Sequence, residues 1–482
     1  MNAPDAFALT RAAGATLTEQ LAAQFGERIR QRLLAPGARL PSVRECARRH
    51  GVSPHTVVAA YDQLLAQGLV EARRQRGFFV REPARGPAAA GRGAAKPATA
   101  AAAAAPAARV APVDATALIR GMFHSAQQRP APGLGTLPPD WLDLPLLASA
   151  LRRVLAHGDA ALALQYGQPA GDSRLREALA TKLADFGVRA PAAQIVTATG
   201  ATQALDIVSR ALLAPGDAVL VDEPGWAVEY ARLTQLGMRL LPVPRGADGP
   251  DLAVMAALAR EHRPRLYVTV SVLHNPTGHS LGLGQAHQVL KLAEAHDFRI
   301  VEDDTYAHLA PAHLPRLAAL DGLHRTLYVS GFSKILTPSW RVGYVAAPPE
   351  LVERLIDVKL LSTLTTPAVL EQAVAHCLEQ GSLRRHAERV VARLDAARHR
   401  VVQLAQAHGC RFVAPPQGLF GWVDTGVDTE PLAQALLDHG WLLAPGHLFH
   451  ATRRPSTLMR INFATSQDAR FWRQLAAARD GA

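Results

Sequence analysis

The segment 82–112, EPARGPAAAGRGAAKPATAAAAAAPAARVAP, sets the organisation of this 482-residue chain. Almost all of it is alanine, proline and glycine with a few basic residues, and Val110 is its one large apolar side chain. Such a segment cannot bury enough apolar surface to offset the entropy that it would lose on ordering. We therefore predict a flexible linker at 83–113, between one folded domain at 1–82 and another at 114–482.

The chain carries a formal net charge of +11, which favours a polyanionic partner. A general bias toward arginine gives the same charge without any partner. The charge is concentrated in residues 1–82, where twelve arginines face seven acidic residues. This domain is therefore where a nucleic-acid surface is expected.

The three cysteines, Cys46, Cys377 and Cys410, lie far apart and form no metal-ligand or disulfide spacing. No apolar run approaches the ~20 residues that span a bilayer, and the N-terminus does not resemble a secretion signal. These features predict a cytoplasmic protein with no metal site and no membrane contact.

The apolar spacing in residues 1–82 predicts three helices and a hairpin. The first helix covers 16–34, the second begins at Ser42 with Glu45 completing a capping box, and the third begins at Ser53. Alternation over 69–80 then predicts two short strands. Three helices followed by a two-stranded wing form a winged helix-turn-helix.

The pattern PGxRLPSxRxxAxxxGVSxxTVxxAYxxLxxxGLxxxxxxxGxFV resembles the DNA-binding domain of the GntR family of bacterial transcription regulators, over nearly all of 16–80. The resemblance implies that the second helix of the pair enters the major groove of operator DNA. Arg48 and Arg49 fit a solvated helix face equally well. Pro54 stands where many members carry arginine, so no operator sequence is implied. The residues that would face DNA are Arg44, Ser53, His55, Thr56, Arg76 and Gly77.

Beyond the linker, strand-like runs alternate with helical segments. The strand-like runs are AQIVTATG, DAVLVDE, RLYVTVS, RIVEDD and TLYVSGF. This alternation predicts an α/β domain with a mostly parallel sheet and helices on both faces. Because ligand sites in such sheets lie at the carboxyl ends of strands, reactive side chains are expected at those ends.

Two motifs at strand ends have structural explanations as well as functional ones. TGATQALD opens a helix, so its backbone N–H groups and the Thr202 hydroxyl are suited to a phosphate, although such turns are also common for packing. HNPTG places Asn275 where it can bond a ligand hydroxyl or shape a turn before Pro276. Each motif alone favours the structural explanation.

Two further motifs add reactive groups. In EDDTY, Asp303 is suited to keeping a ring nitrogen protonated and Tyr306 to donating a hydrogen bond, while a cap and a core tyrosine are the plain alternatives. SGFSK supplies a primary amine at Lys334, and Arg341 supplies a cation for a phosphate. The joint occurrence of these motifs in this order is hard to explain by packing.

The series TGATQ, EPGW, HNPTG, EDDTY, SGFSK, WRVGY and LMRINF resembles fold-type I pyridoxal phosphate enzymes of the aminotransferase class, over roughly 130–475. The resemblance implies a small C-terminal α+β subdomain at about 350–482. It also implies that Lys334 forms a Schiff base with pyridoxal 5'-phosphate, which requires a primary amine. The other implied cofactor residues are Asp303 at the ring nitrogen, Asn275 and Tyr306 at the ring hydroxyl, Trp226 on the ring face, and Ala201, Thr202, Ser333 and Arg341 at the phosphate.

The same resemblance implies a homodimer and a carboxylate clamp. Tyr166 matches a tyrosine that reaches the phosphate of the neighbouring subunit, and Arg460 would hold the α-carboxylate of an amino acid. Two residues depart from the family pattern. Gly331 stands where serine or threonine is frequent, and Ala201 stands where serine is frequent. Lys334 is unaffected by these departures.

A GntR-like winged helix joined by a linker to an aminotransferase-like domain resembles the MocR subfamily of GntR regulators. The resemblance implies a transcription regulator that senses pyridoxal phosphate, a related vitamin B6 form or an amino acid. The alternative is an active aminotransferase with a DNA-binding appendage, since its residue set is intact. A third possibility, an inactive structural domain, is disfavoured because Lys334 and Asp303 are both present.

Overall fold

The computed structural model describes residues 9, 14–30, 34, 36–73, 76–81, 131–157, 164–452 and 454–481. The linker expected at 83–113 lies outside the described residues. The chain divides into two compact units, one formed by 1–129 with 434–442 and the other by 130–433 with 443–482. Among the described residues, no helix combines the length and apolar character needed to traverse a bilayer.

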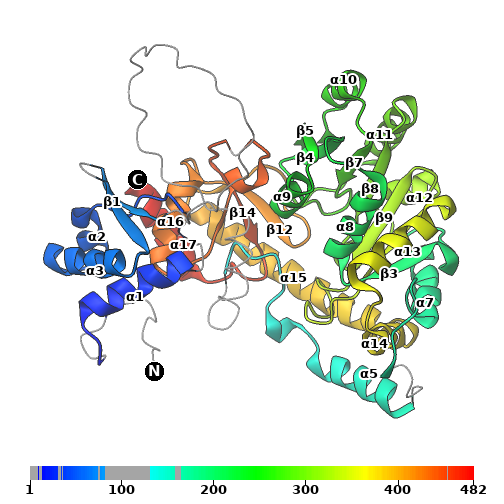
Figure 1. Ribbon diagram of the computed structural model, residues 1–482, viewed down its shortest axis with the longest axis horizontal. Coiled ribbons are helices and arrows are strands. Elements are labelled where there is room, and N and C mark those ends of the chain that lie inside the picture. Colours follow the sequence, from blue (N-terminus) through cyan, green and yellow to red (C-terminus); the bar gives the residue numbers. More distant parts are fainter. Residues whose placement is uncertain are drawn as a thin grey trace, which may run out of the picture. The chain divides into compact units, whose positions relative to one another are not determined.

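In the first unit, the described residues between 17 and 80 form three helices followed by a two-stranded ladder (Figure 1). The strands are antiparallel, with Val70 opposite Val80. The winged helix-turn-helix expected from the sequence is therefore confirmed. Its elements are α1 (Leu17–Arg30), α2 (Val43–His50), α3 (Pro54–Ala66), β1 (Val70–Arg73) and β2 (Gly77–Val80).

The helix starts of this unit are fixed by serine caps. Ser42 Oγ accepts a hydrogen bond from Glu45 N at 3.3 Å, and Ser53 Oγ accepts one from Thr56 N at 3.1 Å. The Glu45 carboxylate pairs with Arg49. Of the capping box expected at α2, the hydrogen bond to the Ser42 side chain is therefore formed. The Glu45 side chain stabilises the helix through its ion pair with Arg49, which lies one turn further along α2.

One apolar core holds the three helices and the wing together. Tyr61 is fully buried, and its hydroxyl donates to Pro41 O at 3.0 Å, so its polar atom is satisfied inside the core. The remaining core side chains include Leu21, Phe25, Cys46, Val57, Leu64, Val70 and Val80.

The second unit is built on an eight-stranded sheet of order β3-β10-β9-β8-β7-β4-β5-β6 (Figure 1). The central strands β9, β8, β7, β4 and β5 are parallel, whereas β10 is antiparallel to both of its neighbours. The strands are β3 (Ile195–Ala198), β4 (Ala218–Glu223), β5 (Arg239–Gly246), β6 (Gly249–Pro250), β7 (Leu266–Thr269), β8 (Arg299–Asp303), β9 (Thr326–Gly331) and β10 (Gly343–Ala346).

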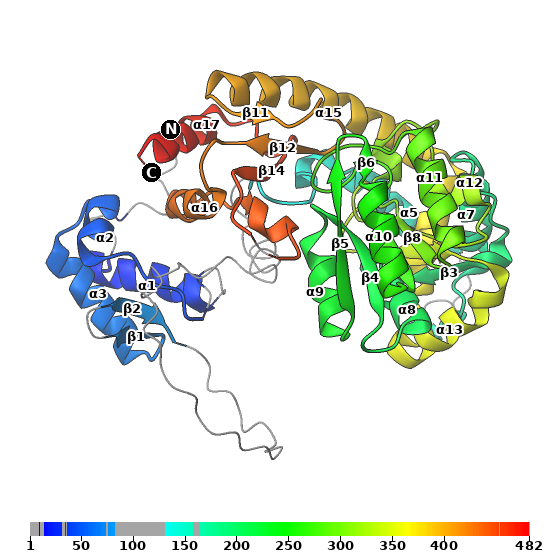
Figure 2. The ribbon, with the colours of Figure 1, turned by 90° about the horizontal axis from the view of Figure 1, so that it is seen from above.

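Helices cover both faces of this sheet (Figure 2), as the sequence predicts. On β4, Val219 and Val221 pack with α8, α9 and α13, while Leu220 packs on the other face with α10, α11 and α12. The described helices beyond residue 130, which include those beside the smaller sheet, are α5 (Leu144–His157), α7 (Ser173–Ala184), α8 (Ala201–Leu212), α9 (Ala227–Gln235), α10 (Leu252–His262), α11 (Leu283–Ala295), α12 (Leu317–Asp321), α13 (Pro349–Thr363), α14 (Ala368–Glu379), α15 (Ser382–Ala407), α16 (Thr429–Asp438) and α17 (Ala469–Asp480).

A second, smaller sheet lies in the C-terminal part of the chain. Its order is β11-β12-β14-β13, and all of its pairs are antiparallel. The long helix α15 runs from α14 toward this sheet (Figure 1). The strands are β11 (Arg411–Phe412), β12 (Phe420–Asp424), β13 (Ala444–Pro445) and β14 (Leu458–Asn462).

Candidate functional site

Four of the expected site residues come from four different elements. Asp303 ends β8, Asn275 follows β7, Lys334 follows β9, and Arg460 lies on β14 of the small sheet. Lys334 Nζ donates to Gly135 O at 2.8 Å. A Cβ built on Gly135 would lie 3.8 Å from both Lys334 Nζ and Arg460 Nη2, so the two cations face one small space beside this glycine.

The amine of Lys334 has a lowered proton affinity. Burial is the main cause, the Arg460 guanidinium adds to it, and Asp303 opposes it, so that the pKa falls to about 8. Near neutral pH, a larger fraction of this amine is uncharged than in an exposed lysine. Lys334 is therefore suited to nucleophilic attack on a carbonyl.

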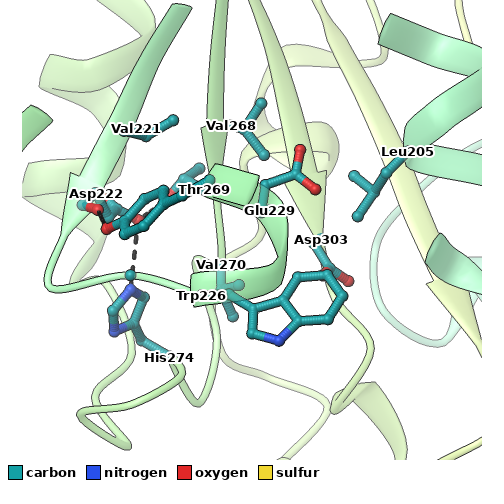
Figure 3. A pocket seen from close by; sticks show the side chains of 12 residues that line it. Leu205, Val221, Asp222, Trp226, Glu229, Val268, Thr269, Val270, His274 and Asp303 are labelled. Carbon is teal, nitrogen blue, oxygen red and sulfur yellow. Dashed lines mark hydrogen bonds and ion pairs between the residues drawn. The ribbon is translucent and has the colours of Figure 1, made fainter. Parts of the chain in front are cut away.

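Asp303 is 7% exposed and accepts hydrogen bonds from the Thr305 N–H, at 3.1 Å, and from the Thr305 hydroxyl. Burial raises its pKa to about 6. With Trp226 it lines a recess of about 350 Å³, a volume that includes the space at the mouth (Figure 3). A buried carboxylate beside an aromatic face is suited to a flat ring that carries a protonated nitrogen.

On one wall of the same recess, Asp222 is hydrogen-bonded within the protein and lies beside His274 (Figure 3). Asp222 accepts from the Tyr267 hydroxyl at 2.6 Å, the Thr269 hydroxyl at 2.7 Å and Arg245 Nη1 at 3.0 Å. Burial raises the pKa of Asp222, but Arg245 and the hydrogen-bond donors outweigh it and bring the pKa to about 2. Burial lowers the pKa of His274 to about 4, so the histidine is neutral beside this ionised carboxylate.

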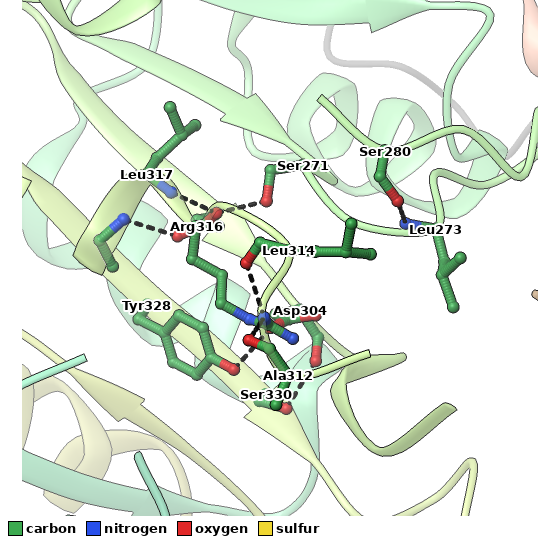
Figure 4. Close-up of polar contacts among 12 residues, drawn as sticks. Ser271, Leu273, Ser280, Asp304, Ala312, Leu314, Arg316, Leu317, Tyr328 and Ser330 are labelled. Carbon is green, nitrogen blue, oxygen red and sulfur yellow. Dashed lines mark hydrogen bonds and ion pairs between the residues drawn. The ribbon is translucent and has the colours of Figure 1, made fainter. Parts of the chain in front are cut away.

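The strand end that carries Asp303 is held by its two neighbours in sequence. Glu302 accepts from the first two backbone N–H groups of α12, both at 2.8 Å, and burial raises its pKa to about 7. Asp304 accepts from Arg316 Nε and the Tyr328 hydroxyl, both at 2.8 Å (Figure 4). These contacts join β8 to α12 and β9, and so restrict where Asp303 can lie.

Arg460 is a buried guanidinium with remaining donor capacity. Its Nη1 donates to Asn275 Oδ1 at 2.9 Å and its Nη2 to Gly133 O at 2.6 Å, while its buried Nε has no hydrogen-bond acceptor among the described residues. Its Cζ lies 4.5 Å from the ring centroid of Phe420 and 5.1 Å from that of Phe449. Burial lowers its pKa to about 10. A buried, incompletely bonded guanidinium is suited to a carboxylate.

The bond to Arg460 also fixes the orientation of Asn275. Because a guanidinium only donates, the amide oxygen of Asn275 faces Arg460, and its NH₂ group points away from the guanidinium. Tyr306 is 6% exposed and packs edge-on against Phe420, with centroids 5.5 Å apart. Burial raises the pKa of Tyr306, and Asn275 acts in the opposite direction through a side-chain hydrogen bond, so the phenol is neutral.

Glycines let the Arg341 guanidinium and β10 pack closely against the start of α8. Gly200 has φ of 87°, and a Cβ on it would overlap the Arg341 guanidinium. A Cβ on Gly343 of β10 would lie 2.6 Å from Ala201 N. The first backbone N–H groups of α8, at Ala201 and Thr202, point outward from the helix as anion donors.

Arg341 lies beside this N-terminal turn. We call Thr199–Thr202 with Ser333 and Arg341 the phosphate cradle, after the cofactor phosphate that the sequence analysis expects there. Arg341 Nη2 donates to Thr199 O at 3.1 Å and its Nη1 to Ser333 Oγ at 2.9 Å. Gly331, where the family pattern favours serine or threonine, is buried, and a Cβ there would lie 3.4 Å from Ala201 N. The smaller residue therefore fits a tightly packed wall.

Tyr166 differs from the other expected cofactor residues, because its side chain is 81% exposed. It lies on a segment that packs against the start of α14, where Gly167 N donates to Thr365 Oγ1 at 3.2 Å. Leu164, two residues before Tyr166, is 82% exposed, and Leu361, four residues before Thr365, is 92% exposed. Exposed apolar side chains of this size are typical of an interaction surface.

In the first unit, the side chains expected to face DNA are mostly exposed. Thr56 is half-buried, and its hydroxyl is bonded to the Ser53 hydroxyl at 2.8 Å. Arg39 was not among the expected residues, yet its Nε lies 3.5 Å from the position of a Cβ on Gly77 at the wing. The exposed residues are Arg44, Ser53, His55, Arg76 and Gly77.

Several residues at the site lie outside the motifs found in the sequence. Phe420 and Phe449 flank Arg460, and the carbonyls of Gly133 and Gly135 accept from the two cations. Their sequence neighbourhoods, GLFGW, GHLFH and PGLGT, contain no catalytic pattern. Only the tertiary contacts reveal them.

Comparison with known proteins identifies both units. Residues 17–80 match the family of bacterial regulatory proteins of the gntR type, and residues 137–476 match the aminotransferase class I and II family. The probable rhizopine catabolism regulatory protein MocR of Rhizobium meliloti is 30% identical over 398 residues, which cover 80% of this chain and 77% of MocR. The uncharacterized HTH-type transcriptional regulator YisV of Bacillus subtilis is 26% identical over 455 residues, 90% of each chain.

The fold of the second unit is also that of a solved aminotransferase. The α-aminoadipate aminotransferase LysN from Thermus thermophilus, in a complex with N-(5'-phosphopyridoxyl)-L-leucine, superposes with a TM-score of 0.69 at 26% identity, covering 76% of this chain and 94% of LysN. The chain therefore belongs to the MocR subfamily of GntR-type regulators, in which a gntR-family DNA-binding domain is joined to a domain of the aminotransferase class I and II family.

Proposed function

We propose that this regulator binds pyridoxal 5'-phosphate in its second unit, reads an amino acid or a vitamin B6 form there, and changes its hold on operator DNA in response. The observation that carries the proposal is the buried amine of Lys334. Its pKa is lowered to about 8, and it lies on the loop that also carries Ser333 of the phosphate cradle.

The residues present fit this cofactor. When bound, pyridoxal phosphate supplies an aldehyde carbon and an electron-withdrawing ring. Lys334 provides the uncharged amine that attaches to the aldehyde, and the carboxylate of Asp303 holds a proton at the ring nitrogen. The other contacts are Asn275 and Tyr306 to the ring hydroxyl, Trp226 on the ring face, and Ala201, Thr202, Ser333 and Arg341 to the phosphate.

A ligand carboxylate fits Arg460, whose Nε has an unused donor beside Phe420 and Phe449. We propose this guanidinium as the point where an amino acid is recognised. We also propose a homodimer, in which the exposed Tyr166 reaches the phosphate cradle of a second copy. The exposed side chains around Tyr166 support this arrangement.

On the DNA side, we propose that α3 enters the major groove and that the wing lies along the backbone. The contacts come from Arg44, Ser53, His55, Thr56, Arg76 and Gly77, as the family resemblance implies. Because the partner is operator DNA, we place the protein in the cytoplasm.

The cofactor proposal is tested by absorbance. Purified protein mixed with pyridoxal phosphate should show a visible band that borohydride abolishes, and Lys334→Ala should lack it. Lys291→Ala is the matched control, since Lys291 lies on α11 away from the motifs of the site. A wild-type protein without such a band would refute the proposal.

The DNA proposal is tested by titrating labelled DNA from upstream of its own gene. Arg44→Ala and Arg76→Ala should each weaken binding and reduce the slope of log affinity against log salt by about one unit. Unchanged slopes in both variants would exclude these side chains as phosphate contacts.

A second candidate function is transamination. It is favoured by the conjunction of Lys334, Asp303 and Arg460 with a pKa of Lys334 near 8, which suits proton transfer as well as attachment. Incubation with amino acids and 2-oxoglutarate distinguishes the two functions. Several turnovers per subunit would establish an enzyme, and a spectral change without turnover would establish a sensor.

A further inference from the structure

Gln203 lies in the first turn of α8 and uses both ends of its amide. Its Oε1 accepts from Thr199 N at 2.5 Å and from Thr199 Oγ1 at 2.9 Å, while its Nε2 donates to Thr363 Oγ1 at 2.7 Å. The oxygen must face Thr199, because a backbone N–H only donates. The Gln203 amide therefore has one fixed orientation, between the cradle and the end of α13.

These bonds act on the peptide that forms the edge of the phosphate cradle. Thr199 is held at its N–H and hydroxyl by Gln203 and at its carbonyl by Arg341 Nη2, at 3.1 Å. The next residue, Gly200, begins α8 with φ of 87° and provides no side-chain cap. Gln203 thus resembles the glutamine of a capping box, which reaches back to a backbone N–H that precedes the helix, and it leaves the N–H groups of Ala201 and Thr202 for a ligand.

The Nε2 group of Gln203 is bonded to the end of α13, and α13 is itself bonded to the sheet. Thr363 is the last residue of α13, and one turn earlier Lys359 is fully buried and donates to Thr197 Oγ1 of β3 at 3.1 Å. The end of α13 is therefore fastened to the sheet on which α8 also packs. A continuous set of hydrogen bonds runs from Thr363 through Gln203 and Thr199 to Arg341.

We propose that Gln203 is a positioning residue for the phosphate cradle, which it holds in register with α13 through Thr363. The proposal rests on the proposed binding of pyridoxal phosphate and adds a residue that does not itself contact the phosphate. A hydrogen-bonded neighbour of this kind restricts the directions of the groups that do contact the ligand.

A positioning role and a merely structural role have different consequences for two ligands. Pyridoxal has the aldehyde and the ring of pyridoxal phosphate but lacks the phosphate group. Loss of a phosphate-positioning residue must weaken pyridoxal phosphate binding alone. Loss of a structural residue must weaken binding of both ligands.

The experiment is equilibrium dialysis of the full-length protein against pyridoxal phosphate and, separately, against pyridoxal. Gln203→Met keeps the length of the side chain but removes its donor and acceptor. Thr363→Val removes the outer partner with little change of shape and leaves α8 intact. Gln288→Met, at an exposed position of α11, is the matched control.

We expect Gln203→Met to weaken pyridoxal phosphate binding roughly three- to tenfold with pyridoxal binding unchanged, the range for one or two lost hydrogen bonds. Thr363→Val should show a smaller loss in the same direction, and the control none. Equal losses for both ligands, or no loss in either variant, would overturn the role of Gln203. A wild-type protein that binds neither ligand would instead overturn the proposed function.

Discussion

Lys334 is one of five lysines in a chain with forty-seven arginines. A guanidinium stays charged at every accessible pH and cannot form a Schiff base, whereas a buried amine can lose its proton. Burial and the neighbouring Arg460 bring the pKa of Lys334 to about 8. The same guanidinium that is suited to a ligand carboxylate therefore also adjusts the reactivity of the amine.

This arrangement predicts the pH dependence of cofactor attachment. The folded-state pKa of Lys334 is depressed, so about half of the amine is uncharged at a pH of about 8, and the uncharged fraction is nearly complete about one pH unit higher. Rapid mixing of cofactor-free protein with pyridoxal phosphate should therefore give an attachment rate that rises through pH 8 and levels off about one pH unit above it. A rate that keeps rising to pH 10, as for an exposed lysine, would contradict the assignment.

Motif order was sufficient to find Lys334, Asp303, Asn275 and Arg341, since each lies at the carboxyl end of a strand or in the loop that follows one. It could not find Phe420 or the role of Gln203. Phe420 contacts Arg460, and Gln203 contacts Thr363, so each contact joins segments that are 40 or more positions apart in the sequence. A local sequence motif cannot predict a contact of this kind. The roles of Lys334, Asp303, Asn275 and Arg341 stay predictions, as do those of Tyr166 and of the residues expected to face DNA.

At the scale of elements, the first turn of α8 depends on a glycine. Gly200→Ala places a Cβ at φ of 87° and into the Arg341 guanidinium. We expect a loss of about 1–3 kcal/mol in the free energy of unfolding, together with weaker pyridoxal phosphate binding. Urea denaturation and dialysis measure these two effects.

Gly284→Ala is the control for that substitution. Gly284 lies in α11, and no atom lies within 4 Å of a Cβ there. It should raise the free energy of unfolding by about 0.5–1 kcal/mol, because alanine is the better helix former. Equal behaviour of the two variants would show that the start of α8 is not strained by a side chain.

The strand β8 depends on the ion pair between Arg316 and Asp304, both of which are buried. Arg316→Met leaves a buried carboxylate without its cation and should lower the free energy of unfolding by about 3–5 kcal/mol. Arg299→Met removes an exposed pair with Glu350 and should cost less than about 1 kcal/mol. A small effect at Arg316 would mean that Asp304 is protonated in the folded state.

Five strands of the large sheet are evident from their apolar runs in the sequence, whereas β5 and β10 are not. β5 contains Pro242 and Pro244 together with a charged Arg245, so it lacks the pattern of a strand. β10 is four residues long and begins at Gly343. β10 lies between β3 and β9 because Gly343 packs closely against the start of α8. The hydrophobic pattern of the sequence does not predict such a contact.

For the whole molecule, the two units have separate apolar cores and should unfold in separate transitions. Pyridoxal phosphate at a hundredfold excess over its dissociation constant should stabilise the second unit by about 2.7 kcal/mol. Calorimetry should show the larger transition moving to higher temperature while the smaller one stays in place. Movement of both transitions would show that the units are thermodynamically coupled.

Lys334 and Arg341 both lie on the connection between β9 and β10, two antiparallel strands in which Gly331 is opposite Gly343. Because β10 also pairs with β3, which leads into α8, the amine and the phosphate cradle are attached to neighbouring strands of one sheet. Arg460 is on a different sheet. The amino acid proposed above would contact the large sheet at one end and Arg460 of the small sheet at the other, so its length would have to match the spacing between the two sheets.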